Sequence, residues 1–232
     1  MSKYNIDLDL DTKNSLSTII SRIKSGSKVL EFGPSHGRLT RFLKEYMECE
    51  VVCVEIDAEA AQEASQYAKR MIVGDIESLL WEEEIAEETF DYIIFADVLE
   101  HLRDPQKILI KVQEYLNKSG SIVISIPNVA HASILIDLLQ DKFIYRDVGL
   151  LDNTHIRLFT KTTLDIMIEE SGLHKQYETS IVKEPNSTEF HNCYEELPSS
   201  VASYIKQSKY ATSYQFVMEL VTQKPQSMIS DF

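Results

Sequence analysis

Short apolar segments alternate with amphipathic segments along most of the chain, and this alternation predicts strands and helices in turn. Continuous apolar runs are typical of strands buried on both faces, whereas apolar residues spaced three or four apart are typical of helices. The expected strands are 28–32, 51–55, 70–73, 92–96, 121–126, 174–182 and 213–221. The expected helices are 16–23, 36–47, 58–69, 105–116, 161–170 and 198–206. This order predicts an α/β fold in which helices cover both faces of a mostly parallel sheet with right-handed crossovers.

Length and composition favour a single domain over residues 1–232. No linker rich in Pro, Gly or Ser divides the 232 residues, and one domain of this size buries roughly 70–75% of its unfolded surface. A helix within residues 1–25 is expected to cover the sheet. No apolar run approaches the ~20 residues of a membrane span, and the N-terminus lacks the apolar core of a secretion signal. We therefore expect a cytoplasmic protein, with its oligomeric state left open.

The charge of the chain argues against nucleic acid as a partner. The formal net charge is −14, and affinity for a polyanion depends on clustered Lys and Arg, which are scattered here. The acidic stretch over residues 81–88 has the composition of a solvated loop or helix face. The cysteines, Cys49, Cys53 and Cys193, form no C-x-x-C pair, so the sequence indicates neither a disulfide framework nor a thiolate metal site.

A strand, a turn of small residues, a helix and a second strand over residues 27–57 predict a crevice of nucleoside size. Gly33 and Gly37 allow a ligand to approach the backbone of the turn closely. The helix that begins near His36 directs unsatisfied N–H groups at this crevice. Glu55 ends the second strand, where a carboxylate accepts two hydrogen bonds from a ribose diol.

The spacing of the turn favours a cationic nucleoside over a dinucleotide. The dinucleotide pattern G-x-G-x-x-G requires a third glycine where this chain has Arg38, and Ser35 replaces the second. Glu31 adds a negative charge two residues before Gly33, which suits an amine or a sulfonium better than phosphates. The G-x-x-x-x-G-K-[ST] phosphate loop does not occur in the chain. A nicotinamide-dependent oxidoreductase remains an alternative, because it shares the turn and Glu55.

Four segments together resemble the class I S-adenosylmethionine-dependent methyltransferases. They are 31–37, 55–57, 73–76 and 90–102, in the family's order and spacing. The resemblance implies a doubly wound seven-stranded sheet of order 3-2-1-4-5-7-6 with an antiparallel edge, and S-adenosyl-L-methionine as cofactor. It implies the following cofactor-binding residues: Glu31, Gly33, Pro34, Ser35, Gly37, Glu55, Ile56, Asp75, Ile76, Ala96, Asp97 and Leu99. Ser35 stands where the family more often has glycine, which keeps open a binding protein that has the fold without the activity.

Two histidines are candidates for catalysis. Methyl transfer from a sulfonium mainly needs an aligned acceptor, and a base is required only when the acceptor is a poor nucleophile such as a hydroxyl. Histidine has the pKa that suits this task. His101 follows the fourth strand of the main sheet, and His155 lies in a polar stretch after the fifth. The alternatives are a cap or packing role for His101 and an architectural hydrogen bond for His155.

Asp97, Glu100 and His101 form a second group of polar residues, with spacing that brings oxygen and nitrogen ligands together. The ubiquinone-biosynthesis O-methyltransferases have a similar arrangement, which implies a divalent ion there. Many class I methyltransferases share Leu-Glu-His in this loop without a metal. We therefore expect no metal.

The segment over residues 125–160 resembles bacterial methyltransferases associated with glycosyltransferases and surface-polysaccharide biosynthesis. This likeness implies O-methylation of a sugar or glycan hydroxyl, with residues 127–160 as an insertion on the acceptor side. Asn128, His131 and the loop 143–154 would line that side, and Phe143 and Tyr145 would stack on a sugar face. A quinone-like or other small metabolite is the alternative acceptor, because fold and cofactor motif do not fix the substrate.

Overall fold

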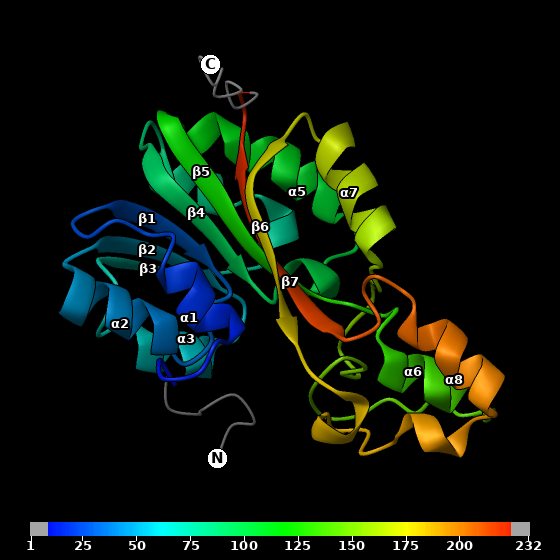
Figure 1. The fold of residues 1–232 in the computed structure, drawn as a ribbon. Coiled ribbons are helices and arrows are strands. Elements are labelled where there is room, and N and C mark those ends of the chain that lie inside the picture. Colours follow the sequence, from blue (N-terminus) through cyan, green and yellow to red (C-terminus); the bar gives the residue numbers. More distant parts are fainter. Residues whose placement is uncertain (1–8, 224–232) are drawn as a thin grey trace.

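The computed structural model describes residues 9–223, in which seven strands form one twisted sheet (Figure 1). The strands are β1 (Lys28–Phe32), β2 (Glu50–Glu55), β3 (Arg70–Val73), β4 (Phe90–Ala96), β5 (Leu116–Pro127), β6 (His174–Val182) and β7 (Ser213–Val221). Their order is β3-β2-β1-β4-β5-β7-β6, which confirms the expected topology. The antiparallel strand is β7, which pairs with β5 and β6 and lies one position inside the edge.

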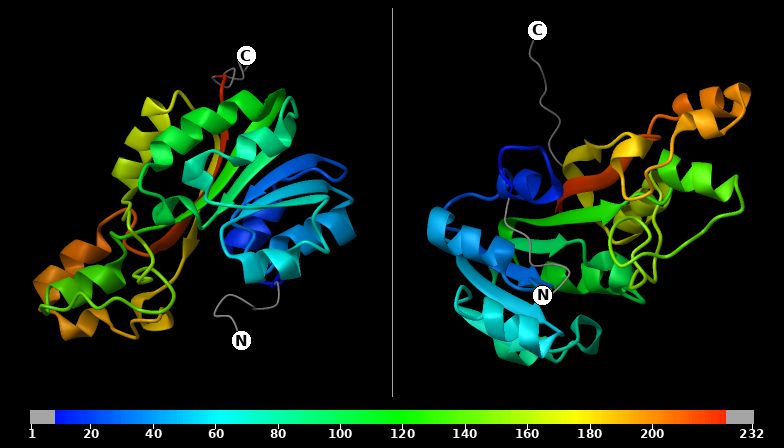
Figure 2. Two further views of the ribbon diagram at one scale, coloured as in Figure 1. Left: turned by 180° about the vertical axis from the view of Figure 1, so that it is seen from behind. Right: turned by 90° about the horizontal axis from the view of Figure 1, so that it is seen from below.

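Helices cover both faces of the sheet (Figures 1 and 2). They are α1 (Ser15–Ile20), α2 (Arg38–Met47), α3 (Ala58–Ala64), α4 (Trp81–Ile85), α5 (Pro105–Val112), α6 (Ala132–Leu138), α7 (Lys161–Glu170) and α8 (Ser199–Lys206). Apolar residues of α1 and α2 pack on one face of the sheet, and those of α4, α5 and α7 pack on the other. Within residues 9–223, every helix is too short or too polar to span a bilayer.

Two helices differ from the sequence prediction, one in where it begins and one in being present at all. Helix α2 begins at Arg38 rather than at position 36, because Gly37 is its N-cap in the left-handed region (φ 78°). Helix α4 was not expected as an element. It exposes Glu83 and Glu84, as the acidic composition predicted, but its spacing of four also buries Trp81 and Ile85 in the main core.

A second lobe, here called the cap, consists of residues 128–160 and 183–212 and lies beyond the ends of β5 and β7 (Figure 1). Its small core joins α6 to α8, with Ile136 packed near Ala202 and Ile205. Asn128 Nδ2 donates to the carbonyl of Tyr210 (3.3 Å), which fastens the first segment of the cap to the second, and to that of Ser213 at the start of β7 (2.8 Å). The expected insertion over 127–160 is therefore only one part of the cap, and the connection between β6 and β7 supplies the other.

Candidate functional site

The turn after β1 depends on two glycines for close packing of the chain on itself. Gly33 has φ 65°, and a Cβ there would lie 2.7 Å from Val98 Cγ2. Gly37 would place a Cβ 2.8 Å from the Cβ of Ala64 in α3. Ser35, between them, is also left-handed, with φ 51°. The glycines thus allow the loop after β4 and helix α3 to approach the turn.

Glu55 connects the turn to the end of β2. Its Oε2 accepts from the backbone N–H of Ser35 (2.8 Å), and its Oε1 accepts from that of Asp57 (2.9 Å). The side chain is buried, yet each oxygen keeps a further lone pair for a ligand hydroxyl. Ile56, the next residue, is 68% exposed, which leaves an apolar surface beside the crevice. Asp75 is exposed at the end of β3 and accepts from Glu77 N (2.8 Å).

Glu31 lies beneath the turn and faces α2. Successive side chains of a strand point to opposite faces, so Leu30 and Phe32 enter the core under α5 while Glu31 points the other way. Thr40 Oγ1 donates to Glu31 Oε2 (2.7 Å) inside this packing. Burial raises the pKa of Glu31 to about 7, and the charge of Glu55 acts in the same direction.

The other predicted cofactor-binding residues occupy three kinds of position. Ile76 and Leu99 lie in the main core, and Pro34 is also buried. Ala96 is half-buried where β4 ends. Asp97 follows it in the left-handed region, with φ 56°, a conformation that costs a non-glycine residue energy and that collects at functional sites.

Polar side chains from two further strands fix the Asp97 carboxylate. Ser125 Oγ donates to Asp97 Oδ1 (2.7 Å), and Gln215 Nε2 donates to the same oxygen (2.9 Å). Burial raises the pKa of Asp97, and these two hydrogen bonds oppose that shift. Neither partner was predicted from the sequence, although Gln215 interrupts an apolar strand and Ser125 lies near the end of another, which are signals for a polar contact at that edge.

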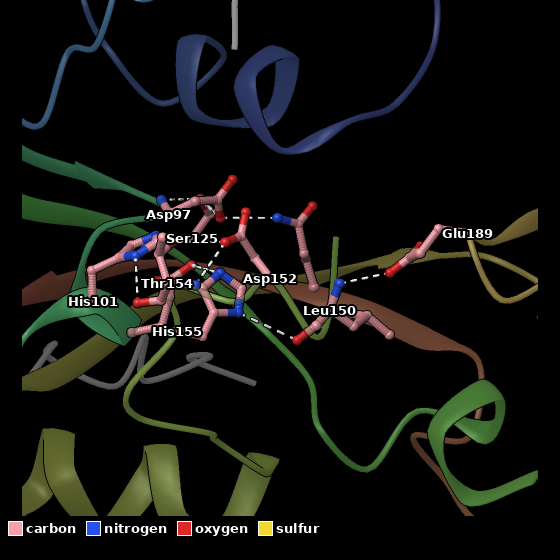
Figure 3. A network of polar contacts seen from close by, with 10 residues as sticks. Asp97, His101, Ser125, Leu150, Asp152, Thr154, His155 and Glu189 are labelled. Carbon is pink, nitrogen blue, oxygen red and sulfur yellow. Dashed lines mark hydrogen bonds and ion pairs between the residues drawn. The ribbon is translucent and has the colours of Figure 1, made fainter. Parts of the chain in front are cut away.

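The two candidate histidines come together beside Asp97 (Figure 3). The rings of His101 and His155 are 4.8 Å apart at an angle of 73°. His101 Nδ1 lies 3.1 Å from the carbonyl oxygen of Thr154, and His155 Nδ1 lies 3.3 Å from that of Leu150. A carbonyl oxygen only accepts, so Nδ1 carries the hydrogen in both rings. In the neutral imidazoles, Nε2 is then the acceptor.

Glu100 lies against His155, with 3.9 Å between Glu100 Oε1 and His155 Nε2. The backbone carbonyl of Glu100 accepts from the N–H groups of Ile156 (3.0 Å) and Arg157 (2.9 Å). These bonds hold the loop that bears His155 against the short 3-10 helix Leu99–His101. Burial raises the pKa of Glu100 well above its usual range, and the charge of Asp97 adds to the effect.

The cap fixes the other end of this loop through Glu189. Glu189 Oε1 accepts from Leu150 N (2.6 Å), and Glu189 Oε2 accepts from the Tyr214 hydroxyl (2.9 Å; Figure 3 shows the first bond). Leu150 in turn accepts from His155, so Glu189 holds the segment that positions the imidazole. Nothing in the sequence around Glu189 distinguishes it from a solvated glutamate.

Asn128 and His131, expected on the acceptor side, instead hold the cap together. His131 is buried, caps α6 by accepting from Ser133 N (3.1 Å), and bonds through Nε2 to the carbonyl of Lys183 (2.9 Å). Burial lowers the pKa of His131. Phe143 and Tyr145 are exposed on the cap, in contact with each other.

Comparisons with known proteins agree with this architecture. Residues 7–178 match a family model described as a methyltransferase domain. No curated protein matches the chain. The three solved structures described next are less than 20% identical to it, and they show the fold alone.

Three of these structures are similar over most of both chains. A possible histamine N-methyltransferase from Thermotoga maritima is 15% identical, with 90% of this chain and 87% of that chain covered and a TM-score of 0.61. A protein described as a putative sarcosine dimethylglycine methyltransferase, from Galdieria sulphuraria, is 16% identical (90% and 84%, TM-score 0.59). An S-adenosylmethionine-dependent methyltransferase from Archaeoglobus fulgidus is 17% identical (88% and 90%, TM-score 0.61). The chain belongs to the matched family of methyltransferases, for which S-adenosylmethionine is the methyl donor.

Proposed function

We propose that this methyltransferase methylates a hydroxyl oxygen of a sugar or glycan. The residues of the crevice fit the donor. Glu55 keeps free lone pairs for a ribose diol, Ile56 offers an uncovered apolar surface for a base, and Asp75 is an exposed acceptor for an amino group. The bound donor supplies an already activated methyl group, so the task of the protein is to align the acceptor with it.

The observation that supports a hydroxyl acceptor is the histidine pair. A neutral hydroxyl is a poor nucleophile near pH 7, and a positioned imidazole that accepts its proton accelerates the reaction. His101 and His155 both keep Nε2 as acceptor, because their Nδ1–H groups are held by Thr154 and Leu150. His101 is half-buried, so its ring borders the solvent side of the site. An amine acceptor would not require this arrangement.

The support for a sugar ring comes from the cap. Phe143 and Tyr145 are 40% and 51% exposed, and their rings lie 5.5 Å apart at 89°. Aromatic faces exposed in this way offer a platform for the apolar face of a pyranose. The same loop exposes Ile144 (57%) and Val148 (44%), which favour the second candidate, a small hydroxylated metabolite with an apolar body.

The test is methyl uptake from labelled S-adenosylmethionine, with sugar nucleotides in one panel and hydroxylated aromatic metabolites in another. We expect uptake in the sugar panel. We also expect His155→Ala to lower turnover by about 10²- to 10⁴-fold, the usual contribution of a general base, with donor affinity unchanged. His174→Ala removes an exposed histidine on β6 and serves as the control. Uptake only by the aromatic panel would select the second candidate, and full activity of His155→Ala would refute the role of this residue.

A further inference from the structure

We infer that Glu100, His101 and His155 form a binding site for a divalent transition-metal ion of the zinc type. Among residues 9–223, these three side chains each bring one possible ligand atom to within 4.8 Å of those of the other two. The inference deepens the proposed function and rests on it only for the role of the ion. The site itself stands on the side chains described below.

The first observation is the Glu100 side chain. It is 1% exposed, and neither of its oxygens has a hydrogen-bond donor among the described residues. A carboxyl group buried without donors is costly, and proteins retain such groups where a cation or another ligand compensates them. Glu31, the matching buried glutamate under the cofactor turn, has Thr40 as a donor. Of these two buried glutamates, only Glu100 lacks a hydrogen-bond donor, and it lies beside a pair of imidazoles.

The second observation is the orientation of the two imidazoles. Metal-binding histidines usually donate their other ring N–H to a carbonyl or carboxylate, which fixes the tautomer and the direction of the lone pair. His101 and His155 both do so, through the carbonyl oxygens of Thr154 and Leu150. Figure 3 shows the two rings beside each other with these bonds. The half-buried His101 gives an ion a route from solvent.

The ligand set selects the class of ion. Two imidazole nitrogens and one carboxylate, with a remaining open position, are typical of zinc sites that bind a further oxygen. Mg²⁺ prefers oxygen ligands throughout. Asp97, which the sequence placed in a group with Glu100 and His101, instead accepts hydrogen bonds from Ser125 and Gln215 through Oδ1. The ligand that completes the set is therefore His155.

The ligand atoms lie within 4.8 Å of one another, so binding requires side-chain rotations that bring them closer to an ion. Ligand atoms around a tetrahedral zinc ion lie about 3.4 Å apart, given bonds of about 2.1 Å. Glu100 Oε1 and His155 Nε2 are already 3.9 Å apart. An ion in this position would take the acceptor oxygen at its open site and lower the pKa of that hydroxyl, so that its proton would leave to solvent water. Without the ion, an imidazole Nε2 accepts that proton instead.

The test is calorimetric titration of the metal-free full-length protein with Zn²⁺ and, separately, with Mg²⁺, in the absence of donor and acceptor. We expect one Zn²⁺ per chain and no binding of Mg²⁺. Glu100→Gln and His155→Ala should each weaken Zn²⁺ binding by about 100-fold or more. The control is His36→Ala, because His36 also lies 3.9 Å from a glutamate oxygen, that of Glu63, outside the proposed site. Circular dichroism and thermal melts identify any variant that fails to fold.

Two outcomes would overturn the inference: no Zn²⁺ binding by the wild-type chain, or equal Zn²⁺ binding by the wild type, Glu100→Gln and His155→Ala. Co²⁺ substitution gives a second readout, since visible absorption of the bound ion reports nitrogen ligands and should disappear in His155→Ala. A chain that binds Zn²⁺ at this site and methylates no hydroxyl would contradict the proposed function alone. Undiminished methylation of a sugar in the presence of a chelator would contradict the role of the ion alone.

Discussion

The cofactor crevice and the acceptor side of this methyltransferase are assembled in different ways. In the crevice, Glu55 bonds to the backbone of Ser35 and Asp57, so most of its geometry arises within one strand-turn-helix-strand unit. On the acceptor side, His155 depends on Glu100 and Glu189, which come from a different loop and from the second segment of the cap. The crevice therefore depends mainly on residues close in sequence, whereas the proposed acceptor site depends on contacts between distant segments, the cap included.

A buried glutamate in each region sharpens the contrast. Glu31 receives a hydrogen bond from Thr40, and Glu100 receives none from the described residues. The Glu31 carboxyl group has a donor within the fold, and burial raises its pKa while the bond from Thr40 opposes that shift. The Glu100 carboxyl group has no donor among the described residues, which is the physical reason for expecting a ligand beside it. The missing donor, rather than burial alone, is therefore the reason for proposing a ligand at Glu100 and not at Glu31.

The largest effect that we expect in the crevice is a pH-dependent gain in stability from Glu31→Gln. The pKa of Glu31 is about 7 in the folded chain and 4.5 when exposed, so the folded state binds this proton more tightly. Wild-type stability should then fall, relative to the variant, as the pH rises from 4.5 to 7. The difference should reach about 3 kcal/mol at pH 8, from about 1.4 kcal/mol for each unit of the pKa difference.

Urea denaturation of both proteins at pH 4 and pH 8 measures this difference. At pH 4 the carboxyl group is protonated in both states, so the two proteins should have nearly equal free energies of unfolding. Other acidic groups contribute equally to the free energy of unfolding of both proteins, so their contributions cancel in the difference. A difference that is the same at both pH values would show that Glu31 is not a buried acid with a raised pKa.

The next effect is on donor binding. Glu55→Ala should weaken the affinity for S-adenosylmethionine by roughly 1.5–3 kcal/mol, the usual value for a hydrogen bond to a charged group. Glu55→Gln keeps a carbonyl acceptor for the backbone and should lose less. Glu59→Ala, which changes an exposed glutamate on the adjoining helix, should bind the donor as the wild type does. Calorimetry with the donor alone decides, and full affinity in Glu55→Ala would exclude Glu55 as the ribose ligand.

The same contrast explains what the sequence could predict. The individual strands, the turn around Gly33 and the position of Glu55 follow from periodicity and from motifs with fixed spacing. The strand order was predicted from the resemblance to the class I methyltransferases that these motifs carry. His101 and His155 were named individually, but their contact was not, because it requires the backbone bonds from Ile156 and Arg157 to Glu100. Spacing along a chain does not encode such long-range pairing.

Other parts of the acceptor side were predicted incompletely for the same reason. Asn128 and His131 have polar side chains in a segment near the site, which suggested acceptor contacts, yet both bond to the second segment of the cap, at Tyr210 and Lys183. That segment, between β6 and β7, has no motif of its own. Its contribution depends on packing between α6 and α8, and helix-on-helix contacts of small and apolar residues leave little pattern in a single sequence.

The smallest effect that we expect concerns Glu189, far from the chemistry. Glu189→Ala removes the acceptor for Leu150 N and for the Tyr214 hydroxyl, so the carbonyl that orients His155 loses its support. Turnover should fall by about 10- to 100-fold, as for other partners that orient a reactive group, while donor affinity stays unchanged. Glu189→Gln retains an acceptor and should recover most of the turnover. Glu195→Ala, an exposed change in the same segment, is the control. A parallel loss of donor affinity would show that the two regions are not independent.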